Sequence, residues 1–271
     1  MGHAAPVRFA PGFELYSVRS LLARDFDGTL EALAQLGYRE VEGSDLFGRT
    51  PEQARLRFDA LGLAAPSWHT FLDPENPAAL DEAIARAAAL GARFLVAATA
   101  KELVCSGPKG VALRDDLPAA GYRGIATFLN RAGERCAAAG LAFAYHNHHV
   151  ELRAVEPGRS GLELLLDETD PALVAFELDL AWTVAGGKDP RALFAKHPGR
   201  FPLCHAKDVN ERGDDLDVGT GIVDFGGILA GAEHAGIRHL FVERDTEEDP
   251  LRTAARGYAH LARWWREEAT A

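Results

Sequence analysis

The chain has 271 residues, of which 47% are hydrophobic and 25% are charged, as in an ordinary globular protein. Its formal net charge of −11 at pH 7 argues against a nucleic-acid partner, because binding to phosphate backbones relies mainly on Lys and Arg. The first residues lack the long apolar segment of a signal peptide, and no apolar run reaches the roughly 20 residues that span a bilayer. Three scattered cysteines form no disulfide framework, so we expect a cytoplasmic protein that binds neither membranes nor nucleic acids.

Short apolar runs alternate with longer helical patterns along the whole chain. We expect strands over Phe13–Val18, Tyr38–Ser44, Ala65–Phe71, Arg93–Thr99, Leu141–His148, Leu173–Leu180, Phe201–Val209 and His239–Asp245. The stretches between them place apolar residues at helical spacing, as at Ile125, Phe128, Leu129, Ala132 and Cys136. Glycines stand where several of these helices end, at Gly37, Gly62, Gly91, Gly140 and Gly236.

Eight alternating strand and helix patterns in a chain of this length predict a single (β/α)₈ TIM barrel over residues 1–271. An open doubly wound sheet is the alternative, but no Gly-x-Gly-x-x-Gly motif follows the first predicted strand. No linker or low-complexity segment divides the chain into further domains. In a TIM barrel the chemistry lies at the C-terminal ends of the strands, so polar residues at the strand ends are the candidates for a site.

Histidines and carboxylates gather at these strand ends. The stretch LAFAYHNHHVEL places His146 and His148 on one side of the fifth predicted strand, opposite Phe143 and Tyr145. The next three strands end in the pairs Glu177 and Asp179, His205 and Lys207, and Glu243 and Asp245. A lone polar residue at a strand end is more often structural, but four consecutive strand ends must converge in a barrel. Because buried like charges repel, a divalent cation would stabilise them, with Mn²⁺, Co²⁺, Zn²⁺ or Fe²⁺ fitting better than Mg²⁺.

Five segments, in order, extend this pattern: YHNHHVEL, FELDLAWTVAGGKDP, LCHAKD, VGTGIVDFGGIL and FVERD. Together they resemble the sugar phosphate isomerase/epimerase-like family of xylose isomerase-like TIM barrels, from about the second predicted strand to the last helix. That superfamily also contains inosose dehydratases, hydroxypyruvate isomerases, ketose 3-epimerases, dehydroshikimate dehydratases and the AP endonuclease IV group. The resemblance therefore implies one fold but several possible reactions.

The resemblance implies one divalent metal ion held by the ends of strands five to eight. The residues that match the ligands of strands six, seven and eight are Asp179, His205 and Glu243. At strand five many members have Glu-Asn-His, whereas this chain has His-Asn-His, so His146 would replace the glutamate and His148 would face the substrate. His148 or Glu151 as the fourth ligand, or three protein ligands and water, are the alternatives.

The implied reaction is isomerisation or epimerisation of a sugar or keto-sugar through an enediolate, with Glu243 as the first proton-transfer group. His148 and Lys207 are the candidates for the second proton transfer. A histidine at strand five makes two-base epimerisation less secure, and a dehydratase or other β-eliminating lyase acting on a keto-sugar or inosose needs just one strong base. A non-catalytic sugar-binding barrel, or a subunit that needs a partner protein, is a further alternative.

Four more residues are candidates for substrate binding: Glu42, His69, Lys101 and Trp182. The glycine-rich turns Gly186–Pro190 and Val218–Gly221 could present backbone N–H groups to a phosphate. A DNA-repair activity like that of the endonuclease branch is disfavoured, since residues 180–182 lack the extra ligands of a three-metal cluster and the chain is acidic. The expected partner is a small sugar-like substrate, with a homodimer left open.

Overall fold

The computed structural model describes residues 10–107, 110–246 and 248–264, so the ends of the predicted domain lie outside the described residues. Eight parallel strands form one sheet in the order β2-β1-β14-β11-β10-β7-β4-β3. They are β1 (Pro11–Glu14), β2 (Glu40–Glu42), β3 (Ser67–Leu72), β4 (Phe94–Ala100), β7 (Ala142–His146), β10 (Val174–Asp179), β11 (Leu203–Ala206) and β14 (His239–Val242). The N–H of His69 donates to the oxygen of Gly43 at 2.9 Å and so joins β3 to the end of β2. The predicted TIM barrel is confirmed.

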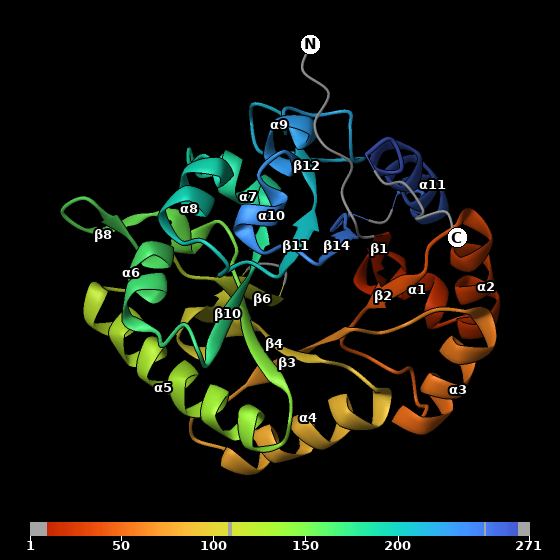
Figure 1. Cartoon of the computed structure of the whole chain (residues 1–271), viewed down its shortest axis with the longest axis horizontal. Coiled ribbons are helices and arrows are strands. Elements are labelled where there is room, and N and C mark those ends of the chain that lie inside the picture. Colours follow the sequence, from red (N-terminus) through yellow and green to blue (C-terminus); the bar gives the residue numbers. More distant parts are fainter. Residues whose placement is uncertain (1–9, 108–109, 247, 265–271) are drawn as a thin grey trace.

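The helices surround the strands, as Figure 1 shows. They are α1 (Arg19–Leu22), α2 (Phe26–Leu36), α3 (Pro51–Leu61), α4 (Pro77–Leu90), α5 (Ala119–Ala138), α6 (Gly161–Glu168), α7 (Leu180–Ala185), α8 (Pro190–Lys196), α9 (Phe225–Leu229), α10 (Ala232–Ala235) and α11 (Pro250–Leu261). The predicted apolar stripe of α5 packs inward, with Ile125, Leu129 and Cys136 fully buried. Gly37 ends α2 with a φ of 112°, a conformation that a residue with a side chain rarely adopts. Among the described residues, no helix has the length and apolarity to cross a membrane.

Several predicted strands end earlier than their apolar patterns suggested. β1 stops at Glu14 because its side chain accepts the N–H of Tyr16 and starts a 3₁₀ helix over Leu15–Val18. β7 stops at His146, and the predicted seventh strand divides at Lys207, which separates β11 from β12 (Asp208–Val209). The apolar patterns do not mark these strand ends, because contacts of individual side chains decide where the chain turns away from the barrel sheet.

Three short hairpins were not predicted from the sequence. They are β5 (Val104–Gly107) with β6 (Gly110–Leu113), β8 (Ala154–Glu156) with β9 (Arg159–Ser160), and β12 with β13 (Asp215–Leu216). All three lie in connections that follow barrel strands, at the end where the site is expected. The first of them contributes to the cavity described below.

The inside of the barrel is apolar at the N-terminal ends of the strands. Five buried side chains form this layer: Phe94, Val96, Ala144, Leu203 and Phe241. Gly12 leaves room for Phe241, because a Cβ on Gly12 would lie 2.4 Å from the ring. This layer fills the barrel at the N-terminal ends of the strands, and the inward-facing residues nearer the C-terminal ends are polar.

Candidate active site

Seven strands or strand ends bring titratable side chains into the part of the barrel near the C-terminal ends of its strands. The buried ones are Glu14, Glu42, His69, His146, Glu177, Asp179, His205, Lys207 and Glu243. The strand register aligns them, since Glu177 is paired with His146 and Asp179 with His205. Neither Glu14 nor Glu177 was assigned a role from the sequence. Glu177 could have been found as the inward neighbour of Asp179 two residues earlier, and Glu14 as the end of the first strand.

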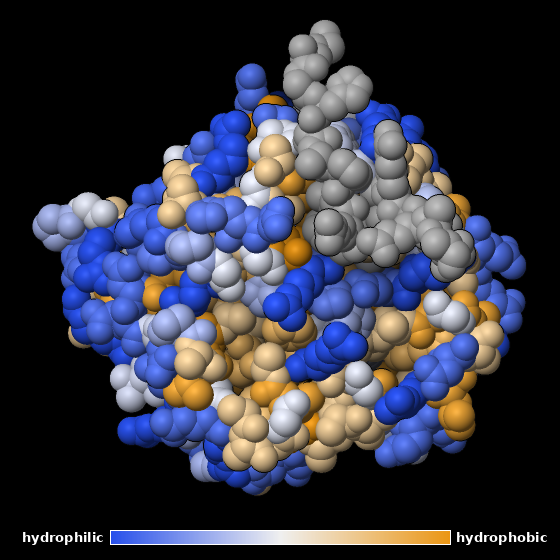
Figure 2. Space-filling view, viewed as in Figure 1, coloured by the Kyte–Doolittle hydropathy of each residue, from blue (hydrophilic) through white to orange (hydrophobic). Residues whose placement is uncertain are grey.

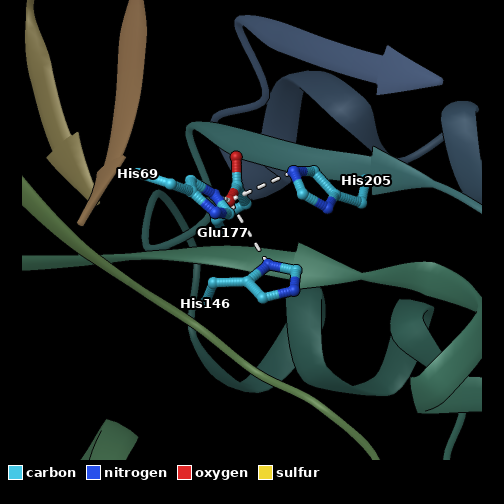
Figure 3. Close-up of side chains that lie close together, drawn as sticks. All are labelled: His69, His146, Glu177 and His205. Atoms are coloured by element: carbon cyan, nitrogen blue, oxygen red, sulfur yellow. Dashed lines mark hydrogen bonds and ion pairs between the residues drawn. The ribbon is translucent and has the colours of Figure 1, made fainter. Parts of the chain in front are cut away.

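Glu177 lies at the centre of a group that we call the inner cluster, with His69, His146 and His205 (Figure 3). Its Oε2 is 2.6 Å from Nε2 of His69, 3.3 Å from Nδ1 of His146 and 3.3 Å from Nε2 of His205. Burial alone would lower the pKa of His69, but the charges of Glu42 and Glu177 outweigh burial and raise it to about 9. His69 is therefore a buried imidazolium held between two carboxylates.

His205 is held by carboxylates at both ring nitrogens. Its Nε2 is 2.7 Å from Oε2 of Glu42, and its Nδ1 is 2.9 Å from Oε2 of Glu243. Burial alone would lower its pKa, but the negative charges of Glu177 and Glu243 raise it well above the ordinary value. The ring therefore connects the inner cluster to the residues at the mouth of the barrel.

We call Asp179, His205 and Glu243 the mouth cluster, because their ligand atoms lie within 4.8 Å of one another. Oδ1 of Asp179 accepts the N–H of Trp182 at 2.8 Å, while its buried Oδ2 has no hydrogen-bond partner. Burial raises the pKa of Asp179 to about 7, although the ammonium of Lys207 acts against it. One carboxylate oxygen thus faces the mouth cluster without a hydrogen bond.

Lys207 lies against the mouth cluster. Its Nζ is 3.0 Å from Oε2 of Glu243, 2.9 Å from Oδ2 of Asp245 and 3.6 Å from Oδ2 of Asp179. Burial would lower its pKa, but these carboxylates raise it well above the ordinary value. The Lys207 ammonium also lies 5.1 Å from the centre of the Trp182 ring, within the range of a cation–π contact.

These residues fit a divalent cation. Five carboxylates are buried together: Glu14, Glu42, Glu177, Asp179 and Glu243. Buried atoms without a hydrogen-bond partner include Oδ2 of Asp179, Oε1 of Glu42, Oε1 of Glu177, and Nδ1 of His146 and of His148. Burial and the charge of Glu42 also raise the pKa of Glu14 to about 8. A mixed set of imidazole and carboxylate donors with unused lone pairs is suited to Mn²⁺, Fe²⁺, Co²⁺ or Zn²⁺.

The four predicted metal ligands are near one another but fall into two groups. Asp179, His205 and Glu243 converge, whereas Nδ1 of His146 faces Glu177 in the inner cluster. The rings of His146 and His205 are nevertheless only 4.4 Å apart, and the ring of His148 is 5.0 Å from that of His146.

Glu151, an alternative fourth ligand, has its carboxylate bound elsewhere. Its Oε1 accepts the hydroxyl of Tyr145 at 2.7 Å, and its Oε2 accepts the N–H of His148 at 3.0 Å. It lies in neither the inner nor the mouth cluster. Its contacts instead hold the turn in which β7 ends.

Three of the four predicted substrate-binding residues lie in or beside the site, and the fourth does not. Glu42 and His69 lie within the site, and Trp182 lies beside Lys207. Lys101 is not brought to the clusters. Its exposed ammonium hydrogen bonds to Asp73 at 2.7 and 2.8 Å and to Glu75 at 2.8 Å.

The glycine N–H groups of the two glycine-rich turns donate within the protein, so the structure does not offer them to a phosphate. In the turn Val218–Gly221, the N–H groups of Gly219 and Gly221 donate to Oδ2 of Asp208 at 2.9 and 2.8 Å. In the turn Gly186–Pro190, residues 186, 187 and 188 donate to carbonyl oxygens of α7. The tight turns require these glycines. The spacing of glycines in a sequence does not distinguish a tight turn from an anion-binding turn.

A cavity of about 280 Å³ opens above the clusters. Its polar lining includes Glu14, His69, His146, His148, Glu243 and Asp245. Its apolar lining, which we call the apolar wall, consists of Phe71, Ala98, Val104, Ala112 and Leu113. A small molecule in this cavity would contact both linings.

Comparison with known proteins identifies the family. The model of the xylose isomerase-like TIM barrel family matches residues 30–268. The inosose dehydratase of Lacticaseibacillus casei is 23% identical over 265 residues, which cover 88% of this chain and 87% of the relative. A solved sugar phosphate isomerase/epimerase from Parabacteroides distasonis has a TM-score of 0.80 and 26% identity, covering 97% of both chains. A solved L-ribulose 3-epimerase, with a TM-score of 0.67, 17% identity and 94% of both chains covered, shares the fold.

The family match covers most of the chain, and the eight-stranded barrel with its polar C-terminal mouth agrees with it. The resemblance inferred from the strand-end motifs is therefore confirmed. This chain belongs to the xylose isomerase-like TIM barrel family.

Proposed function

We propose that the protein is a divalent-metal-dependent lyase that removes a proton beside the carbonyl of a keto-sugar or inosose and then eliminates a β-substituent. The observation that carries this proposal is the position of the Glu243 carboxylate, between Nδ1 of His205 at 2.9 Å and Nζ of Lys207 at 3.0 Å. A base, an imidazole suited to hold a cation and a proton donor thus lie side by side, and Glu243 links them to the cavity that it lines. The inosose dehydratases among the relatives support the same class of reaction.

The mouth cluster would hold the metal ion through Asp179, His205 and Glu243, with His146 as the fourth ligand. A divalent cation bound there would polarise the substrate carbonyl and stabilise the negative charge that develops on its oxygen. The set of buried donors with unused lone pairs supports a metal ion at this position.

Glu243 and Lys207 would carry the two proton transfers. Lys207 and His205 hold the pKa of Glu243 well below its ordinary value despite burial, so the side chain is an ionised carboxylate. The Lys207 ammonium is the corresponding acid and would protonate the departing group. Burial, with the charge of Lys207, lowers the pKa of His148 to about 3, so its neutral imidazole would accept a hydrogen bond from the substrate.

The residue at the end of β7 favours elimination over epimerisation. Two-faced epimerisation needs a second base of comparable strength, which the sequence resemblance assigns to a glutamate where this chain has His146. Burial and the neighbouring charge of His205 push the pKa of His146 well below its ordinary value, so its imidazole is neutral. As a metal ligand it would commit its lone pair to the cation and would not be free to accept a proton.

An isomerase or epimerase is the second candidate. The observation in its favour is the Parabacteroides distasonis structure named a sugar phosphate isomerase/epimerase, which covers 97% of this chain at 26% identity. The first proton transfer would be the same, and only the fate of the enediolate would differ. A non-catalytic sugar-binding barrel is less well supported, because sugar binding alone gives no reason to bury five carboxylates together.

The test is NMR in deuterated water with purified protein, added Mn²⁺ or Co²⁺, an inosose, and a keto-sugar with a β-leaving group. We expect an unsaturated product without epimer, and the matched variant Glu243→Gln should abolish it. Epimer or aldose–ketose interconversion alone would establish the second candidate. Neither product nor deuterium entry beside the carbonyl, with any of these ions, would reject both enzymes.

A further inference from the structure

The cavity above the clusters has two chemically different sides. Its polar side carries the proposed reaction, while its apolar wall comes from the end of β3, from β4 and from the β5–β6 hairpin. The hairpin lies outside the barrel sheet, and Val104 pairs with Leu113 within it. The β5–β6 hairpin, which adds no strand to the barrel sheet, thus brings aliphatic side chains to the mouth of the barrel.

Phe71 is the most exposed member of this wall, with 69% of its surface accessible. Its neighbours on β3 are different, since Trp68 and Leu72 are buried. A single exposed aromatic ring would be unremarkable by itself, but this one lines the same cavity as His69 and Glu243. Ligand sites typically combine such an apolar surface with a few converging polar groups.

A bare inosose or keto-sugar does not account for this wall. Such a substrate carries an oxygen on nearly every carbon, and a wall of Phe, Val, Ala and Leu side chains offers these oxygens no hydrogen bonds. The wall fits a carbon-rich group attached to the sugar.

We propose that the substrate is a keto-glycoside whose apolar aglycone packs against the apolar wall and is the group eliminated. This inference rests on the proposed function and specifies its substrate class. The sugar would occupy the polar side, near Glu243 and His148, and the aglycone would extend toward Phe71 and Val104.

The proposed step balances without an oxidant or reductant. Glu243 takes the proton from the carbon that lies between the carbonyl and the anomeric carbon. A carbon–carbon double bond forms to the anomeric carbon as the bond from that carbon to the aglycone oxygen breaks. Lys207 gives its proton to that oxygen, which leaves the aglycone alcohol and an unsaturated keto-sugar.

The test compares two keto-glycosides with the same sugar, one benzyl and one methyl, whose leaving alcohols are similarly basic. We expect wild-type protein with Mn²⁺ to prefer the benzyl compound by about tenfold or more in kcat/KM, as apolar pockets discriminate. Phe71→Ser and Val104→Ser should each reduce that preference severalfold. The control is Leu56→Ser on α3, a residue that is 70% exposed and is not part of the cavity lining, which should leave the preference unchanged.

Calorimetric binding of the unreactive benzyl and methyl glycosides separates this inference from the proposed reaction. Tighter benzyl binding that Phe71→Ser removes, without turnover of any keto-sugar, would support the substrate class and reject the lyase. Turnover of both keto-glycosides with equal kcat/KM would overturn the substrate class and keep the lyase. If Phe71→Ser dissociates a dimer without changing the preference, the wall is a contact between copies of the chain, and the inference is rejected.

Discussion

The contact between Glu42 and His205 makes a specific prediction about metal binding. Because Oε2 of Glu42 accepts from Nε2 of His205 at 2.7 Å, it would keep the proton on Nε2. The lone pair of Nδ1, which faces Oε2 of Glu243 at 2.9 Å, could then bind a cation at the mouth. An amide at position 42 can donate to Nε2 instead and favour the opposite tautomer. We expect Glu42→Gln to weaken binding of Mn²⁺ or Co²⁺ by about 10- to 100-fold, measured by calorimetry on folded protein.

Glu40 supplies a matched control for this experiment. It forms the same kind of pair with Nδ1 of His239 at 2.8 Å, but it lies at the start of β2, away from the mouth. Glu40→Gln should leave the metal affinity unchanged. Equal affinities for wild type and Glu42→Gln would show that Glu42 does not orient His205.

His146 and His148 have different predicted roles, which substitution can separate. If His146 binds the metal, His146→Glu should retain it and shift the preference toward harder ions such as Mg²⁺. If His148 contacts substrate, His148→Ala should keep the metal and lose turnover by roughly 100-fold, the scale of a misplaced substrate. Measuring the metal content and the kcat of each variant distinguishes the two roles. Loss of metal from His148→Ala with normal turnover on resupply would reverse the two assignments.

At the scale of elements, Asp208 holds the loop after β12. Its two carboxylate oxygens accept four backbone N–H groups, from Val209, Gly219, Gly221 and Val223, at 2.8 to 3.1 Å. Asp208→Asn replaces one acceptor oxygen with a donor, which leaves two of these four N–H groups without an acceptor. We expect a loss of about 1–3 kcal/mol in the free energy of unfolding, measured by urea denaturation.

Asp224 is the control for Asp208, because it accepts a single backbone N–H, from Gly227, at an exposed helix start. Asp224→Asn should have a smaller effect, since asparagine also caps helices well. Similar losses for the two variants would mean that Asp208 is an ordinary turn residue.

At the scale of the whole molecule, Asp217 joins the loop after β13 to the end of β14 and to α11. Its carboxylate lies 2.9 Å from Nη1 of Arg244, 2.8 Å from Nη1 of Arg256 and 2.6 Å from Oγ1 of Thr253. Burial opposes these contacts, yet their sum lowers the pKa of Asp217 below its ordinary value. Asp217→Asn should therefore reduce the free energy of unfolding by about 3 kcal/mol at neutral pH.

The sign of the pH dependence follows from the lowered pKa. The stabilisation by Asp217 is complete above the pKa of the unfolded chain, near 4, and disappears as pH falls through the lower pKa of the folded protein. Denaturation of wild type and Asp217→Asn should thus differ most at pH 7, and the difference should shrink as the pH falls below 4. The exposed pair of Asp214 with Arg212 serves as control, and Asp214→Asn should show no such difference. A difference that does not change with pH would exclude the ion pairs as its cause.

The sequence by itself determined the barrel and much of its mouth. Alternating apolar patterns and helix-ending glycines are local features, and eight repeats in this length leave few folds to choose from. Convergence of Asp179, His205 and Glu243 then follows, because the C-terminal ends of all barrel strands lie at one face. Spacing predicted that the ends of these strands meet, and the resemblance to the xylose isomerase-like family distinguished these three residues from their neighbours.

The tertiary structure decided which side chains actually meet. Glu177 and His69 are 108 residues apart, and Glu42 and His205 are 163 apart, so no local pattern could pair them. The same holds for Lys101, which pairs with Asp73 and Glu75 outside the site, and for the amides of the Val218–Gly221 turn, which Asp208 occupies. Local spacing determines which residues reach the mouth, whereas hydrogen bonds and ion pairs depend on side-chain direction and on the partners that the closed barrel brings within about 3 Å.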